Sequence, residues 1–157
     1  MRLFIAINLT AEVQQAIDAV VAPIRDQAPS IRWVSVERLH VTLKFLGEQE
    51  AATVPALHAA LDGVARTAPL GACRFTGFGV FPNFRAPRVV WIGVQAPGLV
   101  EFAGALDAAL APIGIAPEAR RFAPHLTVGR VNQAVSPRER DDLRGWGAAI
   151  GEVAQHR

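Results

Sequence analysis

The segment that best indicates the fold has the pattern of a β-strand and reads Arg38-Leu39-His40-Val41-Thr42-Leu43-Lys44-Phe45-Leu46-Gly47. Most of its residues are apolar or β-branched, and a glycine ends it, as is typical of a strand. Because side chains along a strand alternate between two faces, four of them are predicted to share a buried face: Leu39, Val41, Leu43 and Phe45. The other face then carries His40, Thr42 and Lys44 in a row. An imidazole, a hydroxyl and an ammonium at these positions predict that this face meets a polar ligand.

The pattern recurs later in the chain, in Pro124-His125-Leu126-Thr127-Val128-Gly129-Arg130-Val131. Again a histidine and a threonine are two residues apart, and Leu126 and Val128 fall on the opposite face. A single histidine in a strand is most often structural. Two of the four histidines in one matched pattern are instead predicted to act as a pair.

Length and composition limit the class of protein. The 157 residues are 51% hydrophobic, which suffices for one domain of at most two small lobes. No apolar run reaches the length of about 18 residues that a membrane span needs, and the apolar start at residues 3–7 is too short for a signal peptide. Cys73 is the only cysteine, which excludes an internal disulfide and a cysteine-rich metal site. We therefore expect a cytoplasmic protein.

The positive charge is almost entirely arginine, since Lys44 is the only lysine among 16 basic residues and the net charge is +2. Guanidinium groups bind phosphate oxygens bidentately. The arginine content as a whole also fits a composition rich in alanine, glycine and proline. We therefore attach function only to arginines beside the histidines.

Periodicity and turn residues predict alternating strands and helices. Strands are expected at residues 2–8, 31–34, 38–47, 73–81, 88–94 and 122–131, and helices at 11–26, 54–67, 98–113 and 137–146. Residues 82–87 have turn composition, so the strands that flank them are predicted to form a hairpin. Two similar halves, each with one His-x-Thr strand, predict an internally duplicated α+β fold.

Two histidines that face a cleft suit acid–base catalysis near neutral pH, because imidazole titrates near pH 6.5. A threonine hydroxyl beside each imidazole can donate to a substrate oxygen, and Lys44 and Arg130 add positive charge. A phosphate fits this surrounding, and in-line displacement at phosphorus needs a base on the attacking oxygen and an acid on the leaving oxygen.

Other chemistries fit the two motifs less well. A metal site needs a third ligand, and no Asp, Glu or Cys is placed beside either motif. Nucleophilic catalysis needs a third group to orient the base, and none is evident. The sequence has neither a Walker loop nor a Gly-x-Gly-x-x-Gly motif. Metal-free acid–base catalysis without a cofactor is therefore the favoured hypothesis.

Several segments in addition to the motifs resemble the 2H phosphoesterases, in particular the bacterial and archaeal RNA 2′,3′-cyclic phosphodiesterases, historically called 2′-5′ RNA ligases. The similarity lies in residues 1–7, 33–47, 79–83, 87–91 and 122–131. It implies a two-lobed, pseudo-symmetric α+β fold with antiparallel sheets around a central cleft. It also implies metal-independent hydrolysis of a terminal RNA 2′,3′-cyclic phosphate to a 2′-phosphomonoester.

The resemblance also implies roles for individual residues. His40 matches the general acid that protonates the departing 3′ oxygen, and His125 matches the base that activates water. Thr42 and Thr127 match the residues that hold the phosphate oxygens, and Arg130 adds a cationic contact. These acid and base roles rest on the resemblance alone, since the two motifs are too alike for their spacing to decide.

Phe81 is a further candidate for substrate binding, because aromatic rings stack the bases of single-stranded RNA. The expected partner is an RNA with a 2′,3′-cyclic phosphate end, such as a tRNA fragment. The same residues also suit 2′-5′ RNA ligation or cleavage of a 2′-5′ linkage. A fourth alternative is a module that binds RNA ends without turnover.

The last residues of the chain predict a departure from the family. The whole chain is expected to be one two-lobed domain, but residues 147–157 hold no evident strand where the family usually has one. We expect a monomer, with dimerisation through an unpaired sheet edge as the alternative.

Overall fold

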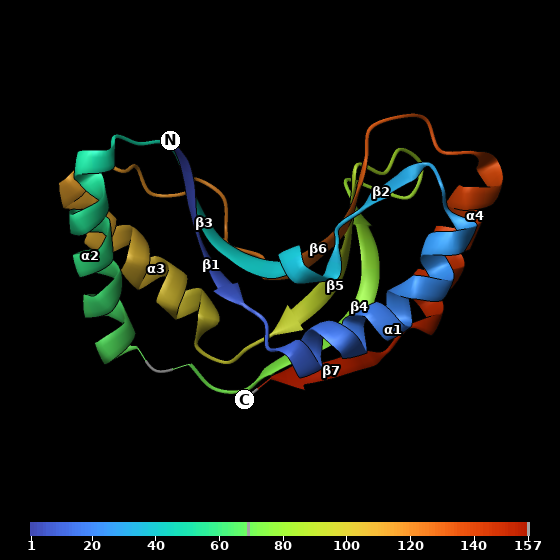
Figure 1. The fold of residues 1–157 in the computed structure, drawn as a ribbon, viewed down its shortest axis with the longest axis horizontal. Helices are drawn as coiled ribbons and strands as arrows, with labels where there is room; N and C mark the ends of the chain where they lie inside the picture. The colour runs from blue at the N-terminus through green and yellow to red at the C-terminus, as the bar shows by residue number, and fades with distance from the viewer. Residues whose placement is uncertain (69, 157) are drawn as a thin grey trace. The chain divides into compact units, whose positions relative to one another are not determined.

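Helices and strands are interspersed along the chain in the structure, a computed structural model that describes residues 1–68 and 70–156. Their order is β1 Arg2–Asn8, α1 Ala11–Gln27, β2 Ile31–Trp33, β3 His40–Glu48, α2 Val54–Thr67, β4 Cys73–Phe81, β5 Val89–Gln95, α3 Leu99–Leu110, β6 His125–Val131, α4 Pro137–Ala149 and β7 Glu152–His156 (Figure 1). The predicted α+β class is confirmed. Among these residues, none of the helices has the length and apolar character that crossing a membrane requires.

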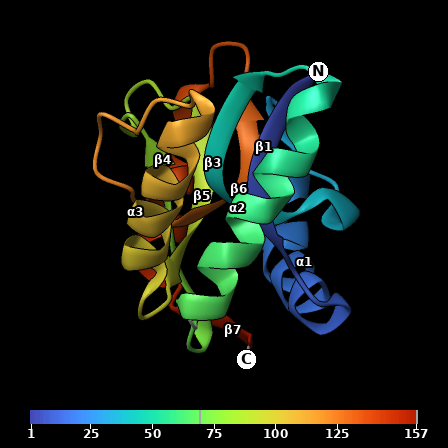
Figure 2. The same cartoon turned by 90° about the vertical axis from the view of Figure 1, so that its left-hand side faces the viewer.

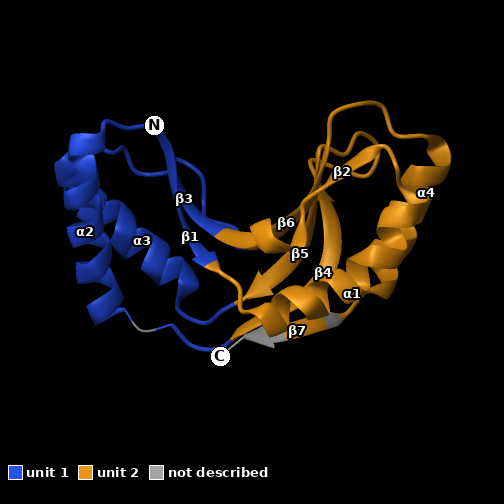
Figure 3. Ribbon diagram, in the orientation of Figure 1, with its two compact units in different colours: residues 1–7, 42–72, 96–124 blue, residues 8–41, 73–95, 125–157 orange. Residues whose placement is uncertain are grey.

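The chain forms two compact units that are interleaved in sequence (Figure 3). Unit 1 consists of Met1–Ile7, Thr42–Ala72 and Ala96–Pro124, and unit 2 of Asn8–Val41, Cys73–Gln95 and His125–Arg157. The units are therefore not the two consecutive halves that the repeated pattern suggested. Both His40 and His125 belong to unit 2, and the boundary crosses β3 between Val41 and Thr42.

Unit 1 is built on a two-stranded sheet of β1 and β3. Helices α2 and α3 pack against each other beside this sheet (Figure 2). The apolar stripes predicted for the two helices supply their buried side chains, which are Leu57 and Val64 of α2 and Leu99, Phe102, Ala103, Leu106 and Leu110 of α3.

The buried face of β3 changes along the strand. Val41 and Leu43 are buried as predicted, but the next buried residues are Lys44 and Leu46. Phe45 is 64% exposed and its ring lies 6.3 Å from that of Phe4 on β1. The prediction that Phe45 is a core residue is therefore wrong, because α3 packs on the side of β3 that carries Lys44.

Unit 2 is built on an antiparallel sheet with the strand order β2-β6-β5-β4-β7. The predicted hairpin is confirmed as β4 and β5. Helices α1 and α4 cover one face of the sheet: Trp146 of α4 packs edge-on against Phe78, and Ile17 of α1 is fully buried. The sheet residues buried on this face are Phe75, Phe78, Val80, Val90, Ile92, Val94, Leu126 and Val128.

The C-terminal segment does contain a strand, contrary to the expectation from the sequence. β7 pairs with β4, where Cys73 lies opposite His156 and Phe75 opposite Ala154. Its sequence has little strand propensity, so the strand depends on backbone hydrogen bonds to the neighbouring edge of β4. Propensity and alternation alone do not reveal such a strand.

Helix α4 begins with the predicted capping box. The Ser136 hydroxyl accepts a hydrogen bond from the Glu139 backbone N–H, and the Glu139 carboxylate accepts one from the Ser136 N–H. The carboxylate also accepts the backbone N–H of Ser30 at 3.1 Å and its hydroxyl at 2.7 Å. Glu139 is only 7% exposed. It therefore joins the start of α4 to the turn between α1 and β2.

These hydrogen bonds determine the ionisation of Glu139. Burial by itself raises the pKa of the carboxyl, but the hydrogen bonds from Ser30 and Ser136 favour the charged form more strongly, so the pKa lies below its ordinary value. A carboxyl with a lower pKa in the folded state stabilises the fold at pH values above its unfolded pKa of about 4.3. That contribution is lost as the pH falls through the folded pKa.

We predict that Glu139→Gln lowers the free energy of unfolding by about 2 kcal/mol at pH 7, the usual worth of a hydrogen bond to a charged group. The difference from the wild type should shrink below about pH 4, where the wild-type carboxyl becomes protonated. Urea denaturation of both proteins between pH 3 and pH 7 measures it. Glu12→Gln, which changes an exposed glutamate in the first turn of α1, should cost less than about 1 kcal/mol. A difference for Glu139→Gln that does not depend on pH would contradict the role of the charge.

Candidate active site

The face of the unit 2 sheet opposite α1 and α4 carries the second histidine motif. We call it the polar face and define it by His125, Thr127 and Arg130 of β6. The buried side chains Leu126 and Val128 of the same strand point to the helix-covered face. Strand alternation thus separates the polar groups of the motif from the core, as the sequence predicts.

A β-bulge in β6 brings Arg130 to the polar face. Thr127 and Arg130 are three residues apart, so regular alternation would place them on opposite faces. However, Trp91 pairs with Thr127 while its neighbour Val90 pairs with Gly129, so β6 has one extra residue at this point. In the resulting register the alternate residues Gly93, Trp91 and Val89 of β5 lie opposite His125, Thr127 and Arg130.

An aromatic cluster lies beside His125 on the polar face. The ring of Phe81 meets the imidazole edge-on, with a centroid separation of 5.2 Å. Phe81 also contacts Trp91, with centroids 5.4 Å apart, and is itself 39% exposed. The structure thus brings together His125 and Phe81, which were identified separately in the sequence.

Trp91 is a residue of this site that the sequence analysis missed. Its indole lies across Gly79 on β4, where an added Cβ would come within 2.3 Å of the ring. The indole N–H is buried and has no hydrogen-bond partner in the described part of the chain, which is unusual for a buried donor. The available signal was that glycines in two adjacent strands, Gly79 and Gly93, leave room for one large ring.

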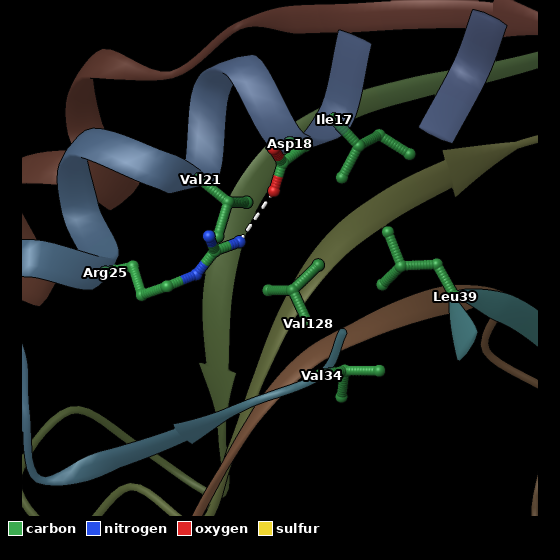
Figure 4. Close-up of a pocket in the computed structure, with 7 residues that line it drawn as sticks. All are labelled: Ile17, Asp18, Val21, Arg25, Val34, Leu39 and Val128. Atoms are coloured by element: carbon green, nitrogen blue, oxygen red, sulfur yellow. Dashed lines mark hydrogen bonds and ion pairs between the residues drawn. The ribbon is translucent and has the colours of Figure 1, made fainter. Parts of the chain in front are cut away.

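The position of Leu39 shows the direction in which the neighbouring His40 side chain projects from unit 2. Leu39 lines a small pocket beneath α1 together with Val34 and Val128 (Figure 4), and the Val34 N–H donates to the Val128 carbonyl at 2.9 Å. Leu39 is extended, so His40 projects away from this pocket, as Thr127 does from Val128. His40 and Thr127 therefore both project away from α1.

The His40 imidazole is oriented by its own backbone. Its Nδ1 lies 2.7 Å from the carbonyl oxygen of Arg38. A carbonyl oxygen only accepts hydrogen bonds, so Nδ1 carries a proton. Nε2 is then the ring nitrogen that gains and loses a proton, and it can act as an acid when protonated or as a base when neutral.

Lys44 does not have the environment expected of a phosphate-binding residue. It is 3% exposed, and its Nζ donates to Asp107 Oδ1 of α3 at 2.5 Å and to the Ala116 carbonyl at 3.0 Å. Asp107 also accepts the Glu118 backbone N–H at 3.1 Å. The expectation of a phosphate contact is therefore corrected: Lys44 is enclosed in unit 1, where its ion pair ties β3 and α3 to residues 116–118. Thr42 is partly exposed and lies on the same side of β3 as His40.

In residues 1–68 and 70–156 no three His, Cys, Asp or Glu side chains are grouped so that they can hold a metal ion. The groups on the polar face are instead donors and aromatic rings. Such a set is suited to binding an anion and a base and to moving protons.

Comparison with known proteins gives one consistent class. The family model described as LigT-like phosphoesterase matches residues 7–91. The chain is 33% identical to an RNA 2′,3′-cyclic phosphodiesterase of Methanothermobacter thermautotrophicus over 154 residues, which cover 98% of the chain and 80% of the relative. It is 33% identical to one of Geobacillus stearothermophilus over 147 residues, covering 93% of the chain. The chain spans about half of this second relative, or 47% of its length.

A solved structure shares the fold. The crystal structure of Escherichia coli LigT complexed with 3′-AMP superposes with a TM-score of 0.68 at 33% identity, covering 86% of this chain and 76% of that one. The similarity therefore extends over most of the chain.

We predict that Lys44→Met destabilises the protein by about 3 kcal/mol, because it leaves the partly buried Asp107 carboxylate without its counter-charge. The double variant Lys44→Met/Asp107→Leu should recover most of this loss, since replacing both charges removes the desolvation cost of each. Urea denaturation measures all three proteins. As a control, Arg25→Met breaks the half-exposed Arg25–Asp18 ion pair and should cost less than about 1 kcal/mol. A Lys44→Met variant as stable as Arg25→Met would contradict a structural role for the pair.

Proposed function

Because the chain belongs to the LigT-like phosphoesterase family, we propose that it is an enzyme that hydrolyses the terminal 2′,3′-cyclic phosphate of RNA to a 2′-phosphomonoester. Water attacks phosphorus, and the bond from phosphorus to the 3′ oxygen breaks. His125 takes a proton from the water, and His40 gives a proton to the departing 3′ oxygen. The products are a 2′-phosphate and a free 3′-hydroxyl. The two imidazoles carry both proton transfers, so the reaction proceeds without a metal ion.

The observation that carries this proposal is the common direction of His40 and Thr127, which both belong to unit 2. Leu39 and Val128 share the pocket beneath α1, and their neighbours His40 and Thr127 project away from it. An in-line displacement needs an acid and a base at one substrate. The hydrogen bond between His40 Nδ1 and the Arg38 carbonyl also supports the proposal, because it fixes the orientation of the imidazole.

The other residues have binding roles in the proposal. Thr42 and Thr127 donate their hydroxyls to the non-bridging phosphate oxygens, and Arg130 adds a charge-assisted hydrogen bond. Phe81 stacks the terminal base, and its contacts with His125 and Trp91 hold the ring beside the reacting phosphate. The Escherichia coli relative has been crystallised with 3′-AMP, which supports a site for a nucleotide end. An RNA substrate implies a cytoplasmic location.

We predict that the wild-type protein converts an RNA with a 2′,3′-cyclic phosphate end to the 2′-phosphate in the presence of EDTA. His40→Ala and His125→Ala should each lower kcat by at least about 100-fold, the usual contribution of one positioned acid or base. The assay follows a 5′-labelled RNA and separates the cyclic from the opened end.

His58→Ala is the matched control, because this histidine is exposed on α2 in unit 1, and it should retain wild-type turnover. A folded wild type that binds the RNA without turnover would favour an end-binding module. Joining of two RNA ends under the same conditions would favour ligation. Full activity in His125→Ala would refute the proposed base.

The separate roles of the two histidines can be tested with a leaving group that needs no acid. We predict that His40→Ala loses much less activity on a 3′-deoxynucleoside 2′-(4-nitrophenyl phosphate) than on the cyclic phosphate, because nitrophenolate departs without a proton. His125→Ala should lose about 100-fold on both substrates, since water still requires a base. Release of nitrophenolate measures the rate. The opposite pattern would exchange the acid and base assignments.

A further inference from the structure

Two arginines face each other on adjacent strands of unit 2. Arg32, in the edge strand β2, lies directly opposite Arg130 in β6, and both side chains are exposed. Side chains at directly opposed positions are about 4.5–5.5 Å apart at Cβ, and like charges there are destabilising. A sheet that keeps such a pair is expected to be stabilised by bound anions that offset the two charges.

Strand register places Arg32 on the polar face. Arg130 lies opposite both Val89 and Arg32, so the three side chains share one face. The neighbours Ile31 and Trp33 point to the other face, where an added Cβ on Gly129 would come within 2.7 Å of Ile31 and 3.2 Å of Trp33. Arg32 therefore projects to the same side as His125 and Thr127.

Among the described residues, no ion pair neutralises the charge of these two arginines. The ion pairs of the described residues join Met1 to Glu48, Arg25 to Asp18 and Lys44 to Asp107, and none of them involves Arg32 or Arg130. The buried lysine is thus paired, whereas these two exposed guanidinium groups keep their donors for a ligand. A guanidinium presents N–H groups in a planar fork that matches phosphate.

The distance from the reacting histidine indicates which phosphate is bound. His125, Thr127 and Arg130 occupy successive positions on the polar face, each two β5 residues apart, or about 6.7 Å. Arg130 is thus about 13 Å from His125 along the strand at Cα. Arg32 is one strand further away. Arg32 is therefore displaced from the reacting phosphate, so a phosphate that it binds is a second one.

We propose that Arg32, beside Arg130, binds the phosphodiester that joins the terminal nucleotide of the RNA to the preceding one. The inference rests on the proposed function and names its substrate class: the ends of RNA chains, in preference to single nucleoside 2′,3′-cyclic phosphates. Arg32 is a binding residue in this reaction and takes no part in proton transfer.

The test compares adenosine 2′,3′-cyclic phosphate with a triadenylate that ends in a 2′,3′-cyclic phosphate. In wild type, kcat/KM should be higher for the triadenylate. Arg32→Ala should lower the triadenylate-to-monomer ratio of kcat/KM by about 10-fold to 100-fold, as expected for one charge-assisted hydrogen bond. Arg32→Gln, which keeps much of the side-chain stem, should do the same. Arg144→Ala removes an exposed arginine from α4 and should leave the ratio unchanged.

A trinucleotide with an uncharged linkage tests whether Arg32 acts on the charge of the phosphodiester. A triadenylate with a methylphosphonate between its last two nucleosides should be as poor a substrate for wild type as the normal triadenylate is for Arg32→Ala. The Arg32→Ala variant should not distinguish these two trinucleotides. An unchanged ratio in Arg32→Ala, or an equal loss on monomer and trinucleotide, would overturn the inference.

Binding distinguishes failure of this inference from failure of the proposed function. If wild type turns over neither substrate, the proposed hydrolysis is wrong. Fluorescence anisotropy of a labelled triadenylate with a 2′-phosphate end then still tests Arg32. Arg32→Ala should weaken binding and reduce the slope of log K against log salt concentration by about 0.7, the value for one phosphate contact on a single strand. Equal affinity and slope in wild type and variant would overturn the site.

Discussion

The arrangement of the polar face depends on the β-bulge in β6. His125, Thr127 and Arg130 are separated by two and then three residues, and a regular strand cannot present all three on one face. The bulge turns Val128 and Gly129 in succession toward the helix-covered side. Only glycine fits at the second of these positions, because a Cβ would come within 2.7 Å of Ile31. The packing of β2 against β6 and the direction of Arg130 are therefore consequences of the same backbone irregularity.

The second constraint is the space that glycines leave on the polar face. Trp91 lies across Gly79, and a Cβ on Gly93 would meet the Thr76 carbonyl at 2.5 Å. The indole lies close to the sheet, and the Phe81 ring contacts both the indole and the His125 ring. The imidazole therefore has an apolar wall on one side and the Thr127 side of β6 on the other. Such surroundings restrict the rotation of the ring, as a positioned acid or base requires.

The sequence allowed prediction of elements with strong local patterns, such as the stripe of Leu99, Phe102, Leu106 and Leu110 in α3 and the capping box of α4. It did not reveal β7, because Val153 is its only β-branched residue and its pairing with β4 is a tertiary interaction. Alternation correctly placed Val41 and Thr42 on opposite faces. It cannot show which face a neighbouring helix covers, so Phe45 was predicted to be buried and Lys44 exposed, whereas the structure has the reverse. His40 and His125 were predictable because each motif is local. Arg32 was not, because its significance comes from register with Arg130.

The use of two kinds of cation follows from burial. The single lysine is enclosed, and its compact ammonium is satisfied by Asp107 and one carbonyl. A buried ion pair of this kind has no charge left to attract a substrate. The exposed arginines on the polar face carry charge that no carboxylate among the described residues offsets. A chain with a net charge of only +2 can therefore concentrate a positive field at one face, because attraction of an anion depends on where charge is left uncompensated rather than on its total.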